Sequence, residues 1–475
     1  MAATAHSLPV SPKQARNSWG VLAALSLAMM LPSLATSIAN AALPALAEVF
    51  AAPFQTAQWI VLIYLLVITT LVVAAGRWGD LAGRRRLLLA GIALFTTASL
   101  LCASAPALPL LIAARGIQGA GAAIMMALTM ALVGDAVPKA KTGVAMGLLG
   151  TMSAVGTALG PALGGLLIAW AGWPAIFLVN VPLGALAFVL AYRCLPGDGP
   201  RAAQPRAGFD SIGTALLLLT LAAYAMAMTM RPFGLLNLML LTAALAVGLA
   251  FLIVETRVAS PLIQLRLLRS GVLRASLATS GLVSTVMMTM LVIGPFYLSG
   301  ALGLDAAATG MVLSAGPLVA TATGVPAGRL VDRFGPQRMA VVSLGGMIAA
   351  TLLLGLMREG LGVPGYIAPI MLLTGSYAIF QAANNTAIMA EADARDRGLV
   401  SGMLNLARNL GLVTGASAMG AAFAFAVGAG EIHAADPQAV ARGARCTFAL
   451  ASILIAVALV IALRHGRSSS AKGEI

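Results

Sequence analysis

Fourteen apolar runs, each long enough to cross a lipid bilayer, constrain the fold of this 475-residue chain more than any other feature. A transmembrane helix needs about 20 mostly apolar residues. The expected spans are 19–46, 57–76, 87–105, 108–131, 143–169, 173–192, 211–229, 233–254, 274–298, 306–327, 339–357, 365–389, 398–427 and 446–463. None alternates polar and apolar residues as a lipid-facing barrel strand does. We therefore predict an all-α integral membrane protein with 14 transmembrane helices.

The composition excludes a water-soluble fold. The chain is 60% hydrophobic and 9% charged, whereas about 25% of the residues of soluble domains are charged. Residues 19–47 resemble a signal peptide, because Lys13 and Arg16 precede an apolar run. Equally apolar runs recur to the end of the chain, so we interpret this run as the first span.

The charges and the reactive side chains exclude several functions. The net charge is +14, but the basic residues lie in short turns and form no continuous basic face, so no nucleic-acid partner is expected. The cysteines are far apart, and the histidines lie in tails or loops, which predicts no metal site. We also expect no cofactor and no enzymatic activity, because no pair of spans offers acid–base chemistry.

Basic residues are distributed unevenly between the loops. If the N-terminus faces the cytoplasm, only Arg231, Arg358, Arg442 and Arg445 lie on outer loops, and Arg115 and Arg408 fall within spans. All other lysines and arginines then lie on the inner side, as the positive-inside rule requires. We predict a multi-pass protein of the cell (inner) membrane with both termini in the cytoplasm.

The chain also carries an internal repeat. "GRWGDLAGRRR" (76–86) and "GRLVDRFGPQR" (328–338) share Gly, Arg, Asp, Gly and Arg at the same five places. Five glycines of 143–165 recur within 398–420 at one constant offset. Parallel repeats of this kind are typical of one large transporter architecture. We expect two six-helix bundles related by pseudo-two-fold symmetry, with two further helices inserted between them.

This repeat predicts the domain organisation of the chain. The expected segments are a cytoplasmic tail (1–18), an N-terminal bundle (19–195), a cytoplasmic linker (196–210), two inserted helices (211–254), a second cytoplasmic linker (255–273), a C-terminal bundle (274–463) and a cytoplasmic tail (464–475).

Several motifs resemble those of the major facilitator superfamily. Residues 76–86 resemble its signature between spans 2 and 3, "RGIQGAG" (115–121) that of span 4, and "GTALGPALGG" (156–165) the antiporter signature of span 5. The motifs "NAALP" (40–44), "FLVNVPLG" (177–184) and "SPLIQLRLLRS" (260–270) resemble the fourteen-span drug:proton antiporter family.

The resemblance implies a function. It implies an exporter of small, mostly apolar compounds such as drugs, which works by alternating access as a monomer and takes protons as its coupling ion. A metabolite exporter of the sugar or amino-acid type, or an uncoupled facilitator, is the alternative within the superfamily.

The repeated loop motif predicts a conformational latch. Gly76 and Gly83 permit a tight turn, and Asp80 can accept hydrogen bonds at a helix N-terminus. The resemblance implies that this N-terminus lies near Gly398 and that Arg84 pairs with Asp135. The full predicted latch is Gly76, Asp80, Gly83, Arg84, Arg86, Asp135, Asp332 and Arg338. The alternative is a signal for membrane topology alone.

The span 5 motif predicts close helix packing. Gly156, Gly160 and Gly164 recur every four residues and form a smooth face. Pro161 removes a backbone donor and should bend the helix, and Gly165 completes the motif. The resemblance ties the motif to export, and ordinary helix packing is the alternative.

Polar residues within the spans predict a central cavity. A charged side chain within a bilayer costs at least about 2.5 kcal/mol, so Arg115 and Arg408 should each face a partner or a wet cavity. The candidate residues for substrate binding or coupling are Asn40, Tyr64, Arg115, Gln118, Gln381, Asn384, Asn385, Asn405, Arg408 and Asn409. For the polar faces of spans 12 and 13, the alternative is an internal hydrogen-bond network that holds the second bundle together.

One departure from the antiporter family bears on the substrate. Many of its members carry an aspartate in span 1, five residues before the asparagine of the "NxALP" motif, where this chain has Ala35. No acidic residue lies inside any expected span. The group that carries the proton is therefore not evident, and neutral or anionic compounds are favoured over lipophilic cations.

Overall fold

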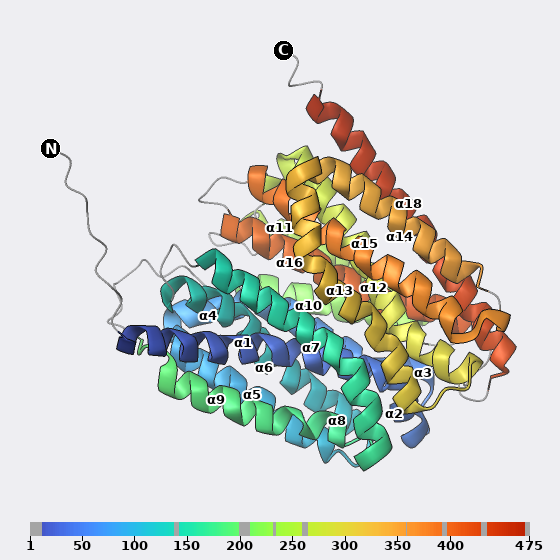
Figure 1. Ribbon diagram of the computed structural model, residues 1–475, viewed down its shortest axis with the longest axis horizontal. Coiled ribbons are helices and arrows are strands. Elements are labelled where there is room, and N and C mark those ends of the chain that lie inside the picture. The colour runs from blue at the N-terminus through green and yellow to red at the C-terminus, as the bar shows by residue number, and fades with distance from the viewer. Residues whose placement is uncertain are drawn as a thin grey trace.

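The computed structural model describes residues 12–136, 142–198, 210–230, 234–258, 265–357, 359–391, 397–428 and 435–470, and these residues form helices joined by short connections (Figure 1). The first half contains α1 (Pro12–Ala41), α2 (Leu43–Val49), α3 (Phe54–Ala57), α4 (Trp59–Ala82), α5 (Arg84–Ala103), α6 (Leu108–Ala136), α7 (Thr142–Ala171), α8 (Ala175–Leu178) and α9 (Asn180–Cys194). The inserted segment contains α10 (Ser211–Thr229), α11 (Leu235–Glu255) and the short η2 (Leu265–Arg269). The second half contains α12 (Gly271–Phe296), η3 (Tyr297–Ala301), α13 (Ala306–Phe334), α14 (Pro336–Gly355), η4 (Glu359–Leu361), α15 (Gly362–Glu391), α16 (Arg397–Thr414), η5 (Gly415–Met419), α17 (Gly420–Val427) and α18 (Pro437–Ser470).

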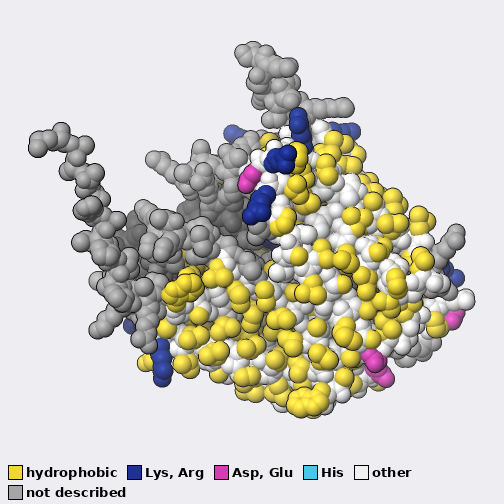
Figure 2. Space-filling model, in the orientation of Figure 1, with side chains coloured by type: hydrophobic (Ala, Val, Ile, Leu, Met, Phe, Trp, Pro, Cys, Tyr) yellow, Lys and Arg dark blue, Asp and Glu magenta, His cyan; other side chains and the backbone are white. Residues whose placement is uncertain are grey.

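In the part of the chain that the structure describes, fourteen helical segments are long and apolar enough to cross a membrane, which confirms the predicted number. Several are composite. The second joins α3 to α4, and the thirteenth joins α16 and α17 through the π-helical turn η5. On the face shown in Figure 2, hydrophobic side chains cover most of the described surface and charged side chains gather at its margins. Such a surface suits a protein whose sides contact lipid.

The helices form two bundles with the inserted pair between them. Helices α1 to α9 form the first bundle and α12 to α18 the second (Figure 1). We call the end at which α1 begins and α18 ends the terminal end, and the opposite end the distal end. Because the spans alternate in direction, Gly83 and Gly335 lie at the terminal end, and α2 and α3 lie at the distal end.

The hydrophobic cores differ between the two ends. One large core contains side chains of both bundles, among them Phe54 of α3, Phe296 of α12 and Phe423 of α17. Toward the terminal end, the first bundle has a core of its own, which includes Val21 and Leu132, and the described residues of the second bundle form two small separate cores. Among the described residues, hydrophobic packing therefore joins the bundles toward the distal end and not at the terminal end.

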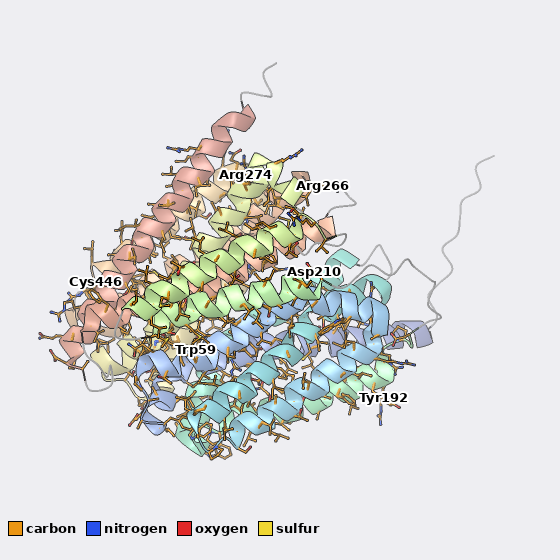
Figure 3. All side chains as sticks on the ribbon, turned by 180° about the vertical axis from the view of Figure 1, so that it is seen from behind. Trp59, Tyr192, Asp210, Arg266, Arg274 and Cys446 are labelled. Carbon is orange, nitrogen blue, oxygen red and sulfur yellow. The ribbon has the colours of Figure 1, made fainter. Side chains whose placement is uncertain are left out.

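The inserted helices lie against both bundles. Figure 3 shows the molecule from behind, with α10 and α11 running along the boundary between its two halves. Helix α10 contacts α4 of the first bundle and α16 of the second. The indole Nε1 of Trp59 donates a hydrogen bond of 3.1 Å to Thr229 Oγ1, and Leu217 and Leu221 join the shared core. The insertion is therefore packed against both bundles and is not a free appendage.

Candidate functional site

The repeated motif forms a turn of a single residue, which corrects our prediction of a longer loop over 76–86. Helix α4 continues to Ala82 and α5 begins at Arg84, so Gly83 alone separates them, with φ of +100°. The second copy repeats this geometry, because Gly335 has φ of +84° between α13 and α14. Only these two glycines of the motif need a positive φ. Gly76 lies within α4, and a Cβ at Gly76 would meet no atom within 4 Å.

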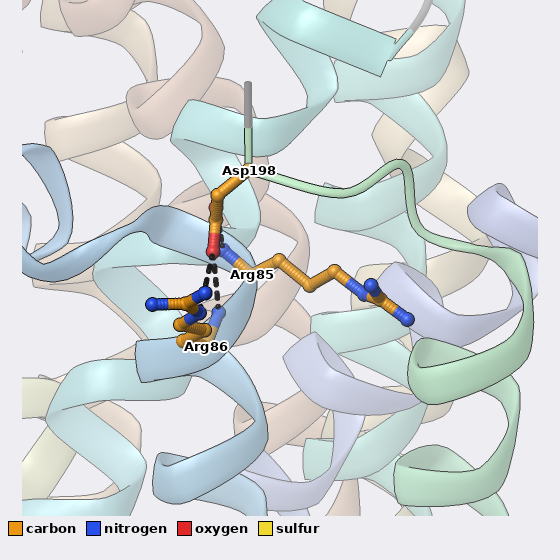
Figure 4. Close-up of polar contacts among 3 residues, drawn as sticks. All are labelled: Arg85, Arg86 and Asp198. Atoms are coloured by element: carbon orange, nitrogen blue, oxygen red, sulfur yellow. Dashed lines mark hydrogen bonds and ion pairs between the residues drawn. The ribbon is translucent and has the colours of Figure 1, made fainter. Parts of the chain in front are cut away.

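Asp198, which follows α9, anchors this turn from the same bundle (Figure 4). Its carboxylate accepts hydrogen bonds from the backbone amides of Arg85 (3.0 Å) and Arg86 (3.3 Å). These amides belong to the first turn of α5, where a helix favours an anion. Arg86 Nε also lies 3.9 Å from Asp198 Oδ2. Because the Arg86 side chain is 80% exposed, this ion pair adds little stability.

Arg85 strengthens the same junction. Its guanidinium donates a hydrogen bond to the carbonyl oxygen of Tyr192 on α9 and lies 5.5 Å from the centre of the Tyr192 ring. The loop motif is thus fastened to the chain that leads into the inserted helices. The residues predicted from the sequence did not include Asp198 or Arg85, although an acid shortly after span 6 was a visible signal.

The predicted partners of the latch are only partly described. The side chains of Asp80 and Asp135 lie outside the described residues, as does the side chain of Arg397 at the start of α16. The pairing of Arg84 with Asp135 therefore stays a prediction. In the second copy, Asp332 and Arg338 are both exposed at the terminal end.

Helix α7 packs on α1 through its glycine face. A Cβ at Gly156 would lie 2.5 Å from the carbonyl oxygen of Met30, and one at Gly160 would lie 2.5 Å from Ser37 Cβ. Ser37 Oγ donates to the carbonyl oxygen of Thr157 at 2.7 Å. A Cβ at Gly164 would lie 3.0 Å from a side-chain carbon of Ile38. These three glycines hold the first bundle together, as the packing interpretation of the motif predicts.

The same helix meets the second bundle through a different face. A Cβ at Gly165 would lie 2.2 Å from the carbonyl oxygen of Ala306, and one at Gly310 would lie 2.2 Å from the carbonyl oxygen of Pro161. Backbone therefore contacts backbone where α7 crosses α13. Pro161 and Gly165 thus belong to the contact between the bundles, and the other motif glycines do not.

Arg115 is fully buried inside the first bundle. Its Nε donates to the carbonyl oxygen of Ile60 at 2.9 Å, and its Nη1 donates to Gln118 Oε1. The guanidinium carbon lies 4.0 Å from the centre of the Tyr64 ring, a distance at which the ring attracts a cation. Gln118 Nε2 in turn donates to Ser99 Oγ at 2.8 Å. The positive charge of Arg115 is therefore stabilised by a carbonyl oxygen, an amide oxygen and an aromatic ring. Its Nη2 has no hydrogen-bond partner among the described residues.

This burial changes our interpretation of three candidate residues. Arg115, Gln118 and Tyr64 are all 0% exposed, and Tyr64 donates to the carbonyl oxygen of Pro32 at 3.0 Å. We expected them to line a cavity, but in this conformation they form an internal network within the first bundle, which we did not predict from the sequence. Asn40 is also buried, and its Nδ2 donates to the carbonyl oxygen of Thr36.

The candidate residues of α15 in the second bundle separate into two groups. Asn384 is buried and donates to Ser280 Oγ on α12 at 2.8 Å, so it also belongs to an internal network. Gln381 is half-buried and donates to the Tyr377 hydroxyl at 2.8 Å. Asn385 is exposed. The predicted common face of α15 is therefore split between helix packing and an open surface.

Helix α16 keeps the polar face that its sequence predicts. Asn405 is exposed, and Arg408 and Asn409 are half-buried, whereas Met403, Leu404 and Leu406 on the other side are buried. Polar and charged groups on a membrane helix face protein or water because lipid does not solvate them. Helix α16 contacts α4 of the first bundle as well as α12 of its own, so the helix that carries this polar face borders both bundles.

Two buried acids lie at the ends of the inserted helices, and neither was among the residues predicted from the sequence. Asp210 is 4% exposed and caps α10, because its Oδ1 accepts from the Gly213 amide at 2.7 Å (Figure 3). Glu255, the last residue of α11, is 3% exposed. A Cβ at Gly213 would lie 2.2 Å from Asp210 Oδ2 and 2.8 Å from Glu255 Oε1. The position of Asp210 directly before an apolar run was a readable helix-start signal.

Comparison with known proteins places the chain among transporters. A family model described as the Major Facilitator Superfamily matches residues 25–416 and 277–474. An uncharacterized transporter, YebQ of Escherichia coli K12, is 31% identical, over 82% of this chain and 86% of its own length. The riboflavin transporter RibZ of Clostridioides difficile is 28% identical, over 83% and 86%. The multidrug efflux pump LfrA of Mycolicibacterium smegmatis is 30% identical, over 85% and 80%.

Solved structures share the fold. A bacterial homolog of the human lysosomal transporter Spinster, described as inward-facing and unoccupied, matches with a TM-score of 0.67 at 15% identity. The match covers 96% of this chain and 98% of that one.

Proposed function

Since the chain belongs to the major facilitator superfamily and is a multi-pass membrane transporter of small molecules, we propose that it is a secondary active exporter that works by alternating access. One observation carries this proposal. The two bundles share a hydrophobic core toward the distal end, and at the terminal end each has its own. A molecule with one joined and one divided end suits a transporter that opens to one side at a time.

We propose that the terminal end faces the cytoplasm. In the predicted topology, most lysines and arginines belong to the tails and to the segments that join spans at this end, which is the arrangement of the positive-inside rule. The conformation described above is then the inward-facing one. In the outward-facing state the bundles would part at the distal end, and the predicted contacts of Asp80 with the start of α16 and of Arg84 with Asp135 would form.

We propose that the substrates are small, mostly apolar compounds such as drugs. The relative LfrA, a multidrug efflux pump, supports this choice. The polar face of α16 offers amides and the guanidinium of Arg408, and Ala35 stands where related antiporters carry an aspartate. We therefore propose that neutral and anionic compounds are exported in preference to cations, because a cation would gain no carboxylate partner on this face.

A second candidate substrate class has its own support. The relative RibZ, at 28% identity, is a riboflavin transporter. Riboflavin is neutral, polar and aromatic, so it would also suit a face of amides beside Arg408. A metabolite or vitamin transporter is therefore the alternative, and it differs from the first proposal in the substrates that would compete.

We propose protons as the coupling ion, which the resemblance of 156–165 to the antiporter signature supports. The rocking units would be the predicted bundles, residues 19–195 and 274–463, within a single chain. Gly165 and Pro161 of the signature would act at the contact between them, because both face α13.

Transport into proteoliposomes with an imposed pH gradient tests the proposal. The panel contains ethidium as a cation, neutral drugs, riboflavin and organic anions. We expect gradient-dependent transport of neutral and anionic compounds, with Arg408→Gln lowering the rate for anions most. The matched control, Arg442→Gln, changes an exposed arginine at the distal end and should leave rates unchanged. Transport of ethidium alone, or rates that do not respond to the gradient, would contradict the proposal.

A further inference from the structure

A polar contact joins the two bundles inside the apolar distal core. Gln58, at the junction of α3 and α4, donates a hydrogen bond of 2.8 Å from Nε2 to the carbonyl oxygen of Ala416. Gln58 is 2% exposed, and Ala416 is 1% exposed. This side-chain bond therefore crosses the boundary that alternating access must open.

The acceptor lies in an unusual part of the second bundle. Ala416 belongs to η5, a single π-helical turn between α16 and α17. Such turns are rare, occur frequently at functional sites, and mark places where a helix bends. The amide of Gln58 also needs Gly420 one turn later, because a Cβ at that position would lie 1.8 Å from Nε2. The helix of the second bundle thus has both an accessible carbonyl and a gap that fit this one amide.

The surroundings make the hydrogen bond depend on closure. Phe54 packs edge-on against Phe296 at 4.7 Å and against Phe423 at 5.8 Å between ring centres, so water is kept from the bond. A hydrogen bond in such surroundings is stronger than the same bond in water. The other amide atom of Gln58, Oε1, is buried without a partner among the described residues. A leucine would avoid this unpaired group, so the amide serves the contact with Ala416 rather than packing.

We infer that Gln58 is a positioning residue that holds the distal end closed through the carbonyl of Ala416. This inference rests on the proposed alternating-access function. When the distal end opens, the bond breaks and both groups meet water. Two contacts between α4 and the span of α16 would then alternate. Gln58, at the distal start of α4, would make its contact when the distal end is closed, and Asp80, near the terminal end of α4, would make its predicted contact when the terminal end is closed.

The test measures how often the distal end opens without any substrate. Ala57 is 0% exposed on α3, which contacts α17, so a cysteine placed there reacts with an impermeant maleimide only when the bundles part. The three native cysteines, Cys102, Cys194 and Cys446, are first replaced by alanine, and the full chain is studied in lipid nanodiscs. In this background Gln58→Leu should raise the labelling rate of Ala57→Cys at least about fivefold, the effect of losing one buried hydrogen bond. The control is Gln55→Leu, one turn earlier and only half-buried, which should not change the rate.

A second variant tests the bond from the other bundle. Gly420→Ala places a methyl group where the Gln58 amide lies, so it should raise the labelling rate as Gln58→Leu does. In the Gln58→Leu background the same change should add nothing, because the displaced group is already gone. Unchanged rates for Gln58→Leu, or effects that multiply in the double variant, would overturn the inference. The assay needs no transport, so a chain that moves none of the tested compounds but shows these rates would refute the proposed function and leave this inference standing.

Discussion

Two glycines set how closely the bundles approach at the distal end, and each can be replaced by the smallest possible change. Gly165 of α7 and Gly310 of α13 each lie against the backbone of the opposite helix. We predict that Gly165→Ala and Gly310→Ala shift the protein toward the state in which the distal end is open. In that state the added methyl group meets no helix of the other bundle. The free-energy cost of the clash therefore raises only the distal-closed state, and the whole cost appears in the equilibrium between the two states.

The structure gives the expected magnitude. The new Cβ would lie 2.2 Å from a carbonyl oxygen in either variant, whereas carbon atoms pack best at about 3.5–4.0 Å. The helices must therefore separate by roughly 1 Å, and overpacking of this kind costs about 1–3 kcal/mol. Since about 1.4 kcal/mol is a tenfold change, the ratio of distal-open to distal-closed protein should rise about 5- to 150-fold.

Spin-label distances measure this shift. Labels at Trp170→Cys on α7 and Leu356→Cys after α14, which are 87% and 75% exposed, report the distance between the bundles at the distal end. The matched control is Gly160→Ala, because its methyl group would meet Ser37 within the same bundle. This control should lower the melting temperature and leave the distances unchanged. If Gly165→Ala lowers stability without lengthening any distance, the bundles do not part at this contact and the reasoning is refuted.

Three further predictions follow from the N-terminal bundle, and melting of the purified protein in detergent checks each of them. Gly83→Ala should lower stability by about 1–3 kcal/mol because φ is +100°, whereas Gly76→Ala should raise it by up to about 1 kcal/mol; equal losses would contradict this. Asp198→Ala should cost about 0.5–2 kcal/mol by removing the acceptor at the start of α5, and Asp198→Asn should cost less because an oxygen remains; equal losses for the two variants would show that the charge of Asp198, and not its hydrogen bonds to α5, is what stabilises the turn. Arg115→Lys should destabilise the protein strongly, because an ammonium group cannot reproduce the hydrogen bonds of the guanidinium to Ile60 and Gln118 or its contact with the Tyr64 ring. An unchanged melting temperature would contradict the network and support the original prediction that Arg115 lines a cavity.

The fold could be predicted from the sequence to a large extent. Span length, charge distribution and the repeat are one-dimensional signals, and a bilayer leaves few alternatives once they are read. The number of spans and the family are confirmed. The turn at Gly83 was expected to be longer because the charged residues around it suggested a loop, but charged side chains at a membrane surface do not prevent helix continuation through Ala82.

The site was less predictable, because polar residues of a span have two possible environments. Arg115 and Arg408 look alike in the sequence, yet the first is enclosed by Tyr64 and Gln118 and the second lies on the half-buried face of α16. The rotation of each helix about its own axis decides whether such a side chain joins a hydrogen-bond network inside one bundle or lies on a less buried face of the helix. Gln58 was missed for a related reason. Its acceptor is a carbonyl oxygen, which leaves no trace in the side chains of a sequence.

The central claim is that the two ends of the molecule open alternately, and one pair of distances tests it most directly. Labels at Trp170→Cys and Leu356→Cys report the distal end, and labels at Trp19→Cys and Val342→Cys, which are 74% and 61% exposed, report the terminal end. As Gly165→Ala or an imposed pH gradient shifts the population, we expect the distal distance to lengthen while the terminal distance shortens. Distances that stay fixed at both ends, or that lengthen together, would contradict alternating access in this protein.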